Sequence, residues 1–368
     1  MIRIKKIKLG VLRIPLRKPF VSALRYVDSI EDVVVQIETD CGLRGYGVAT
    51  PALRVNGESV DSIISVVRDL FAPKLIGNDI SGFETLLNAI DHCVVGHSAA
   101  KASIDVAIHD LISQAAGFPL YRFLGGNSKQ ITTGISISNN ALDEMVNDAC
   151  AAVSDGFTTL KLKLGSDQGI DTDIRLVQQI RGLVGGQVEI GVDANQAWSE
   201  KDALKFVLRM ETIGANLAFI EQPVLSSELS SLARVAAASR IPVLADESCS
   251  SLHAAVDLIN DELIDGVAIK LMKLGGIRAA RVVYDVARLR SKICAVTCLM
   301  ESPIGVAASA SFCSGRNVRF IDLDPMALIA HNPVIGGVTM LANKLVLGDV
   351  PGLGIEGIEG VEPVVTIK

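Results

Sequence analysis

One pattern decides the fold, and it recurs as TLKLKLG at residues 159–165, GVDAN at 191–195, FIEQP at 219–223, LADES at 244–248 and AIKLMK at 268–273. Each copy is a short apolar run that ends in a charged residue and leads through polar or turn-forming residues into a helix-like segment. The charged positions follow at intervals of 30, 28, 25 and 24 residues, from Lys163 through Asp193, Glu221 and Asp246 to Lys270. Since a strand-helix unit takes roughly 30 residues, the pattern predicts successive βα units of an α/β protein.

The charged residue of each copy lies at the carboxyl end of its predicted strand. In a (β/α)8 barrel these ends share one rim, and catalytic residues sit there. Asp193, Glu221 and Asp246 come from three consecutive strands and offer only acceptor oxygens, which suits Mg²⁺. Lys163 and Lys270 flank them, an arrangement that can remove a proton from carbon and return it. One charged residue at a strand end is more often solvated or salt-bridged, but five in this order indicate a site.

Eight barrel strands follow from this register: Ile131–Ser138, Thr158–Leu164, Val188–Asn195, Leu217–Pro223, Ile241–Ser248, Gly266–Met272, Ala295–Met300 and Phe320–Asp324. The segments between them carry apolar residues at helical spacing, for example Ala203, Phe206, Val207 and Met210. We therefore expect a (β/α)8 barrel over residues 127–325.

The residues before the barrel predict an α+β capping domain over 1–126. Apolar runs predict strands at 2–14, 31–39 and 43–48, and an irregular polar loop is expected at 18–26. Helices are expected at 60–71 (closed by Pro73), 81–95 and 98–116, and the last is apolar nearly all round, so it should be buried between domains. Residues 326–368 should return as strands that complete the capping domain, with 364–367 as the last strand.

The composition indicates a folded cytoplasmic protein. A chain of 368 residues with 49% hydrophobic residues can bury a large core, and a formal charge of −6 argues against nucleic acid or an anionic membrane as a partner. Neither a signal-peptide apolar region nor an apolar run of membrane-spanning length occurs. The seven cysteines lack paired spacing and are expected as reduced thiols, with Cys294 and Cys298 in the core.

The recurring motifs also carry a resemblance. The chain resembles the muconate lactonizing enzyme subgroup of the enolase superfamily over essentially its whole length, through Lys161-Leu162-Lys163, Asp193-Ala194-Asn195, Glu221-Gln222-Pro223, Asp246-Glu247-Ser248 and Lys270-Leu271-Met272-Lys273. The resemblance implies a capping domain whose first loop closes over the active site. It also implies a Mg²⁺ cofactor, a homo-oligomer and, as at enolase-superfamily sites in general, a Lys or His base acting beside metal that stabilises an enediolate.

Strand geometry assigns roles to the lysines. Lys161 and Lys163 lie two apart and therefore on one strand face. A lysine base needs its pKa lowered from about 10.4 toward about 7–8, and a neighbouring positive charge contributes to that shift. We assign Lys163 as one acid/base, Lys161 as its electrostatic partner and Lys270 as the acid/base on the opposite face of the substrate. Asn195 is expected to hydrogen-bond beside the metal ligands, and Lys273 is expected at the surface or at a helix start.

Four further residues bear on the substrate. Asp322 and Asp324 share one face of the last barrel strand, where they either clamp a cation or, for Asp324, cap the following helix. Their Asp-x-Asp spacing resembles that of the dipeptide epimerases, where it binds the α-ammonium group. Arg25 resembles the lid arginine of L-Ala-D/L-Glu epimerases, which meets the glutamyl carboxylate in a geometry that suits a guanidinium; a solvated loop arginine is the alternative. Ser136 matches a substrate-contacting position of those enzymes.

These observations favour a Mg²⁺-dependent dipeptide epimerase that inverts the α-carbon of the C-terminal residue. L-Ala-D/L-Glu is the expected substrate, and the resemblance implies a role in recycling cell-wall peptides. The alternative is a muconate cycloisomerase or an o-succinylbenzoate synthase, for which Asp322 and Asp324 would be dispensable. A third hypothesis, a non-catalytic binding barrel, predicts that Lys163→Ala leaves function unchanged. The expected partner is a small dipeptide, and the sequence does not fix which one.

Overall fold

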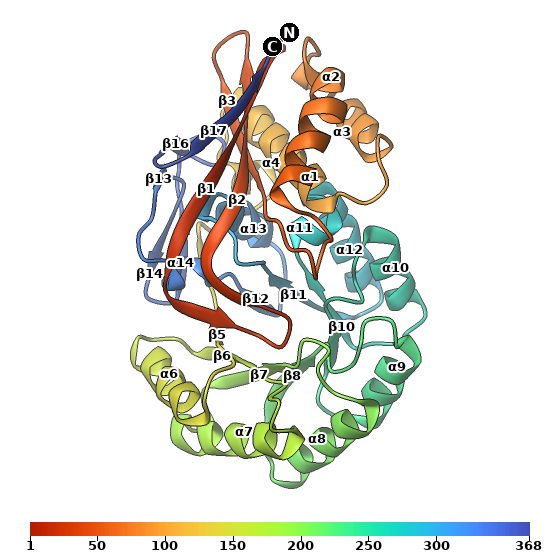
Figure 1. Cartoon of the computed structure of the whole chain (residues 1–368). Coiled ribbons are helices and arrows are strands. Elements are labelled where there is room, and N and C mark those ends of the chain that lie inside the picture. Colours follow the sequence, from red (N-terminus) through yellow and green to blue (C-terminus); the bar gives the residue numbers. More distant parts are fainter.

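The structure is a computed structural model that describes residues 1–368, with a capping sheet at one end and the barrel at the other (Figure 1). The capping sheet is antiparallel and has the order β17-β1-β2-β3. Its strands are β1 (Ile4–Val21), β2 (Tyr26–Thr39), β3 (Arg44–Ala49) and β17 (Glu362–Ile367). The N- and C-terminal residues therefore lie side by side at the end of the molecule farthest from the barrel helices.

Strands β1 and β2 form a much longer hairpin than the sequence predicted. The irregular loop expected at 18–26 is wrong, because Phe20 pairs with Val27 and Val21 pairs with Tyr26. Only residues 22–25 form the turn, which the hydrogen bond from Ser22 N to the Arg25 carbonyl closes at 2.9 Å. An irregularity in the register after Pro15, which has no N–H to donate, coincides with the bend that brings the hairpin tip to the barrel (Figure 1).

Helices cover one side of the capping sheet. Helix α1 (Val60–Val66), a π-helical turn (Val67–Phe71) and α2 (Ala72–Leu75) follow without a break, so Pro73 does not close the helix as predicted. A 3-10 turn (Ile80–Gly82) leads into α3 (Phe83–Asp91), and α4 (Ser98–Ala115) is buried between the sheet and the barrel, as predicted. Glycine in β3 allows this close approach, since a Cβ at Gly47 would lie 2.0 Å from the Ser103 carbonyl oxygen.

Eight parallel strands in the order β5 to β12 build the barrel. They are β5 (Ile135–Ile137), β6 (Thr159–Lys163), β7 (Glu189–Asp193), β8 (Leu217–Glu221), β9 (Val243–Ala245), β10 (Gly266–Ile269), β11 (Ile293–Thr297) and β12 (Phe320–Asp322). The predicted first strand is divided, because β4 (Gln130–Thr132) leaves the barrel to pair with β15. The hydrogen bond from Gly134 N to the Ile321 carbonyl, 2.8 Å long, joins the chain beside β5 to β12.

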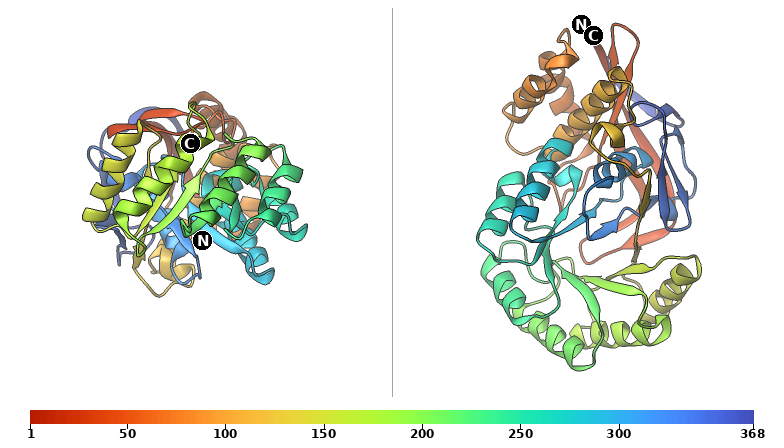
Figure 2. Two further views of the ribbon diagram at one scale, coloured as in Figure 1. Left: turned by 90° about the horizontal axis from the view of Figure 1, so that it is seen from below. Right: turned by 180° about the vertical axis from the view of Figure 1, so that it is seen from behind.

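Helices surround the barrel strands on the outside (Figure 2). They are α6 (Leu142–Ser154), α7 (Ile170–Val184), α8 (Glu200–Thr212), α9 (Leu229–Ala238), α10 (Leu252–Asn260), α11 (Leu271–Leu274), α12 (Ile277–Leu289) and α13 (Pro303–Cys313). Helix α8 buries the four apolar residues that the sequence singled out, and the Ser199 side chain caps its first turn. None of the helices is long and apolar enough to span a membrane.

The chain after the barrel is mostly short strands. These elements are α14 (Pro325–Leu328), β13 (Val334–Gly336), β14 (Val338–Leu341), β15 (Lys344–Leu347) and β16 (Ile355–Ile358), and the short helix α5 (Leu120–Phe123) precedes the barrel. Strands β14 and β15 form a sheet with β4, and β13 pairs with β16. Only the final strand β17 reaches the capping sheet, where Ile367 pairs with Ile7.

Candidate active site

Three carboxylates meet at the carboxyl rim of the barrel. Asp193 and Glu221 are the last residues of β7 and β8, where they pair in register, and Asp246 follows β9 directly. One oxygen from each lies within 4.8 Å of the others, and all three side chains are buried. Burial raises the pKa of Glu221 to about 8. Burial opposes ionisation of Asp193 and Asp246 as well, but neighbouring lysines hold the pKa of both below its usual range.

Four lysines contact these carboxylates. Lys163, the last residue of β6, places Nζ 2.6 Å from Asp193 Oδ2, and Lys270 places Nζ 2.6 Å from Asp246 Oδ2. Lys163 and Lys270 therefore approach the carboxylate group from β6 and from the end of β10, that is, from opposite sides. Burial alone would lower the pKa of Lys270, but the charges of Asp246 and Glu221 raise it, so the lowered pKa expected of a lysine base is not found at Lys270.

Lys161 precedes Lys163 by two residues on β6 and therefore lies deeper in the barrel. Its Nζ is 3.3 Å from both oxygens of Glu221, 3.7 Å from Asp193 Oδ2 and 2.7 Å from Asp322 Oδ2. Burial alone would lower the pKa of Lys161, but these three carboxylates raise it well above its usual range. Lys161 is therefore a fixed positive charge that links the carboxylates of β7 and β8 to the aspartate of β12.

Lys273 stands at a helix start, in the first turn of α11, as one of the two predicted alternatives had it, but the other alternative, a position at the surface, is wrong. Its side chain is 1% exposed, and Nζ donates to both the carbonyl and the Oδ1 of Asp246. The reason is that β10 ends at Ile269, so residues 271–274 form helix α11, which packs against α4, instead of continuing the strand outward. Asp246 is thereby held between Lys270 on one oxygen and Lys273 on the other.

Two residues that the sequence analysis did not assign also shape the rim. The Gln222 side-chain oxygen accepts hydrogen bonds from the backbone N–H groups of Asp246, at 2.9 Å, and Ser248, at 3.0 Å. Gln222 thus fixes the loop that carries Asp246. Glu247 is a fourth buried carboxylate beside the triad, and burial raises its pKa to about 7. Its position directly after Asp246 was the available signal, but adjacent residues of a strand point to opposite faces, so that position alone gave no reason to assign Glu247 to the site.

Asn195 lies beside the carboxylates, as predicted. It has a left-handed backbone, with φ of 43°, its backbone N–H donates to Asp193 Oδ1 at 2.9 Å, and Nδ2 donates to Glu247 Oε1 at 3.0 Å. Asn195 Oδ1 and Glu247 Oε2 are buried and have no hydrogen-bond partner. A buried acceptor that receives no hydrogen bond lowers the stability of the folded protein. Together with three converging carboxylates, these free acceptors fit a hard divalent cation with oxygen ligands.

Asp322 and Asp324 face the cavity from β12 and from the residues that follow it. The Ser136 hydroxyl donates to Asp322 Oδ2 at 3.1 Å, and the Ser136 backbone N–H donates to Asp324 Oδ2 at 2.7 Å. Asp324 stands at the start of α14, but its side chain makes no capping hydrogen bond, so the capping alternative has no support. Burial, reinforced by the charge of Asp322, raises the pKa of Asp324 to about 7.

The tip of the β1–β2 hairpin covers these groups. Its residue Arg25 lines the same cavity as Ser136, Lys161, Lys163, Asn195, Lys270, Asp322 and Asp324. Cys298 also lines this cavity and is only partly buried against the core, whereas Cys294 is buried as predicted. We call this space, of about 40 Å³, the catalytic cavity. All the residues proposed from the sequence for catalysis and substrate contact therefore converge on one place.

Comparison with known proteins identifies the family. The family described as Enolase C-terminal domain-like matches residues 144–360, and the Mandelate racemase / muconate lactonizing enzyme, N-terminal domain, matches residues 6–125. The L-Ala-D/L-Glu epimerase of Clostridium acetobutylicum is 38% identical, over 96% of this chain and 99% of the relative. The hydrophobic dipeptide epimerase of Enterococcus faecalis is 35% identical, over 96% of this chain and 99% of the relative.

Solved structures agree with the sequence relatives. The substrate-liganded L-Ala-D/L-Glu epimerase from Bacillus subtilis superposes with a TM-score of 0.94 at 36% identity, covering 99% of this chain and 100% of that one. The dipeptide epimerase from Enterococcus faecalis V583, complexed with Mg and L-Leu-L-Tyr, superposes with a TM-score of 0.92 at 34% identity, covering 96% of this chain and 99% of that one. The chain thus belongs to the mandelate racemase / muconate lactonizing enzyme group of the enolase superfamily and is one of its epimerases and racemases.

Proposed function

We propose that this enzyme is a Mg²⁺-dependent dipeptide epimerase that inverts the C-terminal residue and acts on L-Ala-D/L-Glu. The observation that carries the proposal is the pair Lys163 and Lys270 on opposite sides of the carboxylate triad, under a lid that holds an arginine without a partner. Relatives that act on acidic and on hydrophobic dipeptides have nearly the same identity, 38% and 35%. Identity therefore does not choose the substrate, and the argument rests on the residues of the site.

Inversion at carbon needs one base and one acid on opposite faces of the α-carbon. A substrate carboxylate at the triad would place the α-carbon between Lys163 and Lys270, so either lysine can take the α-proton and the other can return one from the far side. Mg²⁺ held by Asp193, Glu221 and Asp246 would offset the negative charge that develops on that carboxylate. Lys161 is engaged with three carboxylates and contributes a fixed charge.

The two aspartates at the end of β12, Asp322 and Asp324, supply the amine end of the site. Asp322 and Asp324 line the catalytic cavity, where Asp322 is also paired with Lys161 at 2.7 Å. A substrate ammonium group there would stabilise the charged form of Asp324, whose pKa of about 7 leaves it partly protonated at neutral pH. Such a clamp has no purpose in a muconate cycloisomerase or an o-succinylbenzoate synthase, whose substrates lack an ammonium group.

Arg25 favours an acidic residue at the inverted position. The Arg25 guanidinium lies at the catalytic cavity without an ion pair to the protein, and burial lowers its pKa. A substrate carboxylate would satisfy this charge through two parallel hydrogen bonds. An enzyme of this specificity would suit the recycling of cell-wall peptides, and its assembly into a homo-oligomer stays a prediction.

The test is exchange of the α-proton, followed by NMR. The protein with Mg²⁺ in D₂O is given L-Ala-L-Glu, L-Ala-L-Gln, L-Leu-L-Tyr and muconate in separate reactions. We expect loss of the α-proton signal of the C-terminal residue, with the L,D-epimer appearing, and fastest exchange for L-Ala-L-Glu. Fastest exchange of L-Leu-L-Tyr would refute the acidic specificity, and cycloisomerisation of muconate with no exchange of any dipeptide would refute the epimerase itself.

A further inference from the structure

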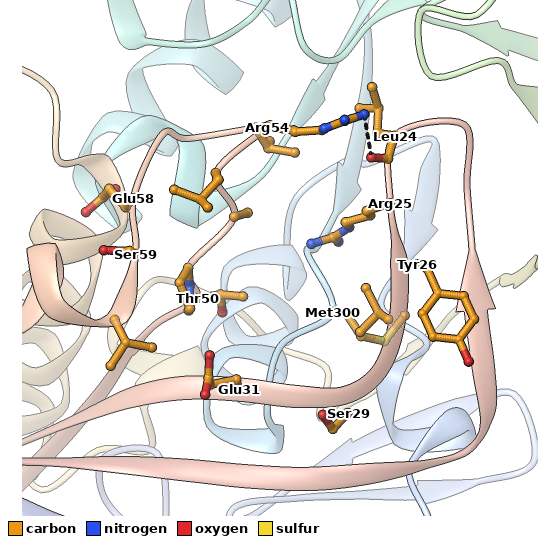
Figure 3. Close-up of a pocket in the computed structure, with 16 residues that line it drawn as sticks. Leu24, Arg25, Tyr26, Ser29, Glu31, Thr50, Arg54, Glu58, Ser59 and Met300 are labelled. Atoms are coloured by element: carbon orange, nitrogen blue, oxygen red, sulfur yellow. Dashed lines mark hydrogen bonds between the residues drawn. The ribbon is translucent and has the colours of Figure 1, made fainter.

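A second and larger cavity adjoins the catalytic cavity. It lies between the lid hairpin, the loop after β3 and Met300 of the barrel, and its volume is about 430 Å³ (Figure 3). We call it the outer cavity. It has about ten times the volume of the catalytic cavity and falls in the range of about 300–1,000 Å³ that small-molecule sites occupy.

The two cavities share a wall of four residues. Leu24, Arg25, Val55 and Met300 line both. Figure 3 shows Arg25 pointing from the hairpin into the outer cavity, with Arg54 reaching across the mouth to the hairpin. Arg54 Nη1 donates to the Leu24 carbonyl at 3.2 Å. A group that leaves the catalytic cavity past Arg25 therefore enters a space that a second guanidinium borders.

The two arginines of the outer cavity have no carboxylate partner in the protein, whereas its two glutamates are engaged elsewhere. Four charged residues line this cavity, Glu31, Glu58, Arg25 and Arg54. Glu31 is already paired with Arg13, at 2.8 Å. Glu58 accepts the backbone N–H groups of Ala99, at 2.7 Å, and Ala100, at 3.1 Å, at the start of α4. Neither carboxylate contacts the two lining arginines, so a ligand with an anionic group is the chemical complement of this cavity.

The direction of the substrate side chain follows from the proposed function, on which this inference rests. Four groups surround the inverted α-carbon. Its carboxylate lies at the triad, its amide nitrogen leads to the N-terminal residue whose ammonium lies at Asp322 and Asp324, and its proton faces Lys163 or Lys270, so the remaining substituent is the side chain. The lid is the remaining wall, and it presents Arg25. We propose that the outer cavity is a side-chain subsite that admits acidic residues longer than glutamate, whose terminal carboxylate reaches Arg54.

A homologous series of substrates tests the proposal. L-Alanyl dipeptides of aspartate, glutamate, 2-aminoadipate and 2-aminopimelate differ only in the length of the acidic side chain, and L-Ala-L-norleucine serves as the neutral control. We expect kcat/KM for α-proton exchange with 2-aminoadipate and 2-aminopimelate to stay within about tenfold of glutamate, a loss of at most about 1.4 kcal/mol, and well above norleucine. A loss of more than about a hundredfold on lengthening past glutamate would overturn the subsite.

Variants of Arg54 separate binding from lid closure. Arg54→Gln should lower the ratio of kcat/KM for 2-aminopimelate to that for glutamate by about tenfold, and Arg54→Glu should lower it further. Arg54 is exposed, so neither change removes a buried contact. Arg68→Gln, which removes another exposed arginine that is paired only with Asp69, is the matched control and should leave the ratio unchanged.

The outcomes distinguish the two proposals. An equal loss for both substrates in Arg54→Gln would show that Arg54 only fastens the lid through the Leu24 carbonyl, and the subsite would be rejected. Exchange of L-Ala-L-Glu without any longer acid would reject the subsite and leave the proposed function standing. Absence of exchange with every dipeptide of the series would reject both.

Discussion

Replacing Arg25 by glutamine should change which dipeptides are epimerised without weakening the fold. The guanidinium makes no ion pair with the protein, and its pKa is lowered by burial, so the substitution removes a desolvated charge instead of a native contact. A hydrogen bond to a charged group contributes about 1.5–3 kcal/mol. For the contact with a glutamyl carboxylate, this corresponds to a loss of about 10- to 150-fold in kcat/KM. A neutral side chain of similar size should lose far less.

The assay compares α-proton exchange of L-Ala-L-Glu and L-Ala-L-norleucine in the wild type, Arg25→Gln and Arg25→Lys. We expect the preference for glutamate to collapse in the glutamine variant and to recover only in part with lysine, which keeps the charge but not the planar fork. The melting temperature of all three should agree within a few degrees, about 1 kcal/mol or less. Equal losses on both substrates would refute the reasoning, because Arg25 would then be a residue that shapes the lid.

Other positions give predictions of different kinds. Lys163→Met and Lys270→Met should each lower epimerisation by about 10²–10⁴-fold, and NMR in D₂O should show that each variant still exchanges only the isomer whose α-proton faces its remaining lysine. Exchange of both isomers by one variant would contradict the two-lysine arrangement. Lys273→Met leaves the buried Asp246 with one lysine, so chemical denaturation should show that the free energy of unfolding falls by about 3–5 kcal/mol. The control Lys205→Met breaks an exposed ion pair and should lower the free energy of unfolding by about 1 kcal/mol or less. In Asp324→Asn the side-chain oxygen can still accept the hydrogen bond from the Ser136 N–H. The variant should lower kcat/KM for L-Ala-L-Glu by about 10- to 100-fold, but kcat/KM for the N-acetylated dipeptide, which has no ammonium group, should fall much less. Equal losses for both substrates would exclude a role of Asp324 in binding the ammonium group. Burial raises the pKa of Asp110 from 3.8 to about 6, so the native state holds this proton after the unfolded chain has lost it. The contribution of Asp110 to the free energy of unfolding should therefore fall by about 2–3 kcal/mol between pH 4 and 6, and Asp110→Asn should flatten that part of the denaturation profile.

The barrel and its rim could be predicted because they obey a local rule. Each strand is a short apolar run, and its last residue points to the rim, so Lys163, Asp193 and Glu221 follow from the sequence alone. The same rule failed where a strand ends early. Lys273 and Glu247 lie beyond the last paired residues of β10 and β9, and there alternation no longer determines direction. Their contacts depend on how two loops pack, which the spacing of residues does not encode.

The sequence predicted where in the chain the lid lies but not its secondary structure. Polar residues and Pro19 suggested an irregular loop, but pairing with β2 imposes strand structure up to Val21. Tertiary pairing overrides the local preference of these residues. For the same reason the turn is limited to residues 22–25, which aims Arg25 at the barrel. The outer cavity was also beyond the sequence, because three segments far apart in the chain form its walls.

The pairing of β1 with β17 sets an order of events during synthesis. Ile7 and Ile367 are partners across 360 residues of sequence, whereas each barrel strand pairs with a neighbour only one unit away. Contacts between distant residues form late, because a long loop must close first. On the ribosome, the barrel strands can therefore associate while the capping sheet still lacks its edge strand β17. The strand that begins the lid hairpin gains its last neighbour only when residues 362–367 have emerged, so the lid support should be completed after the barrel strands have associated.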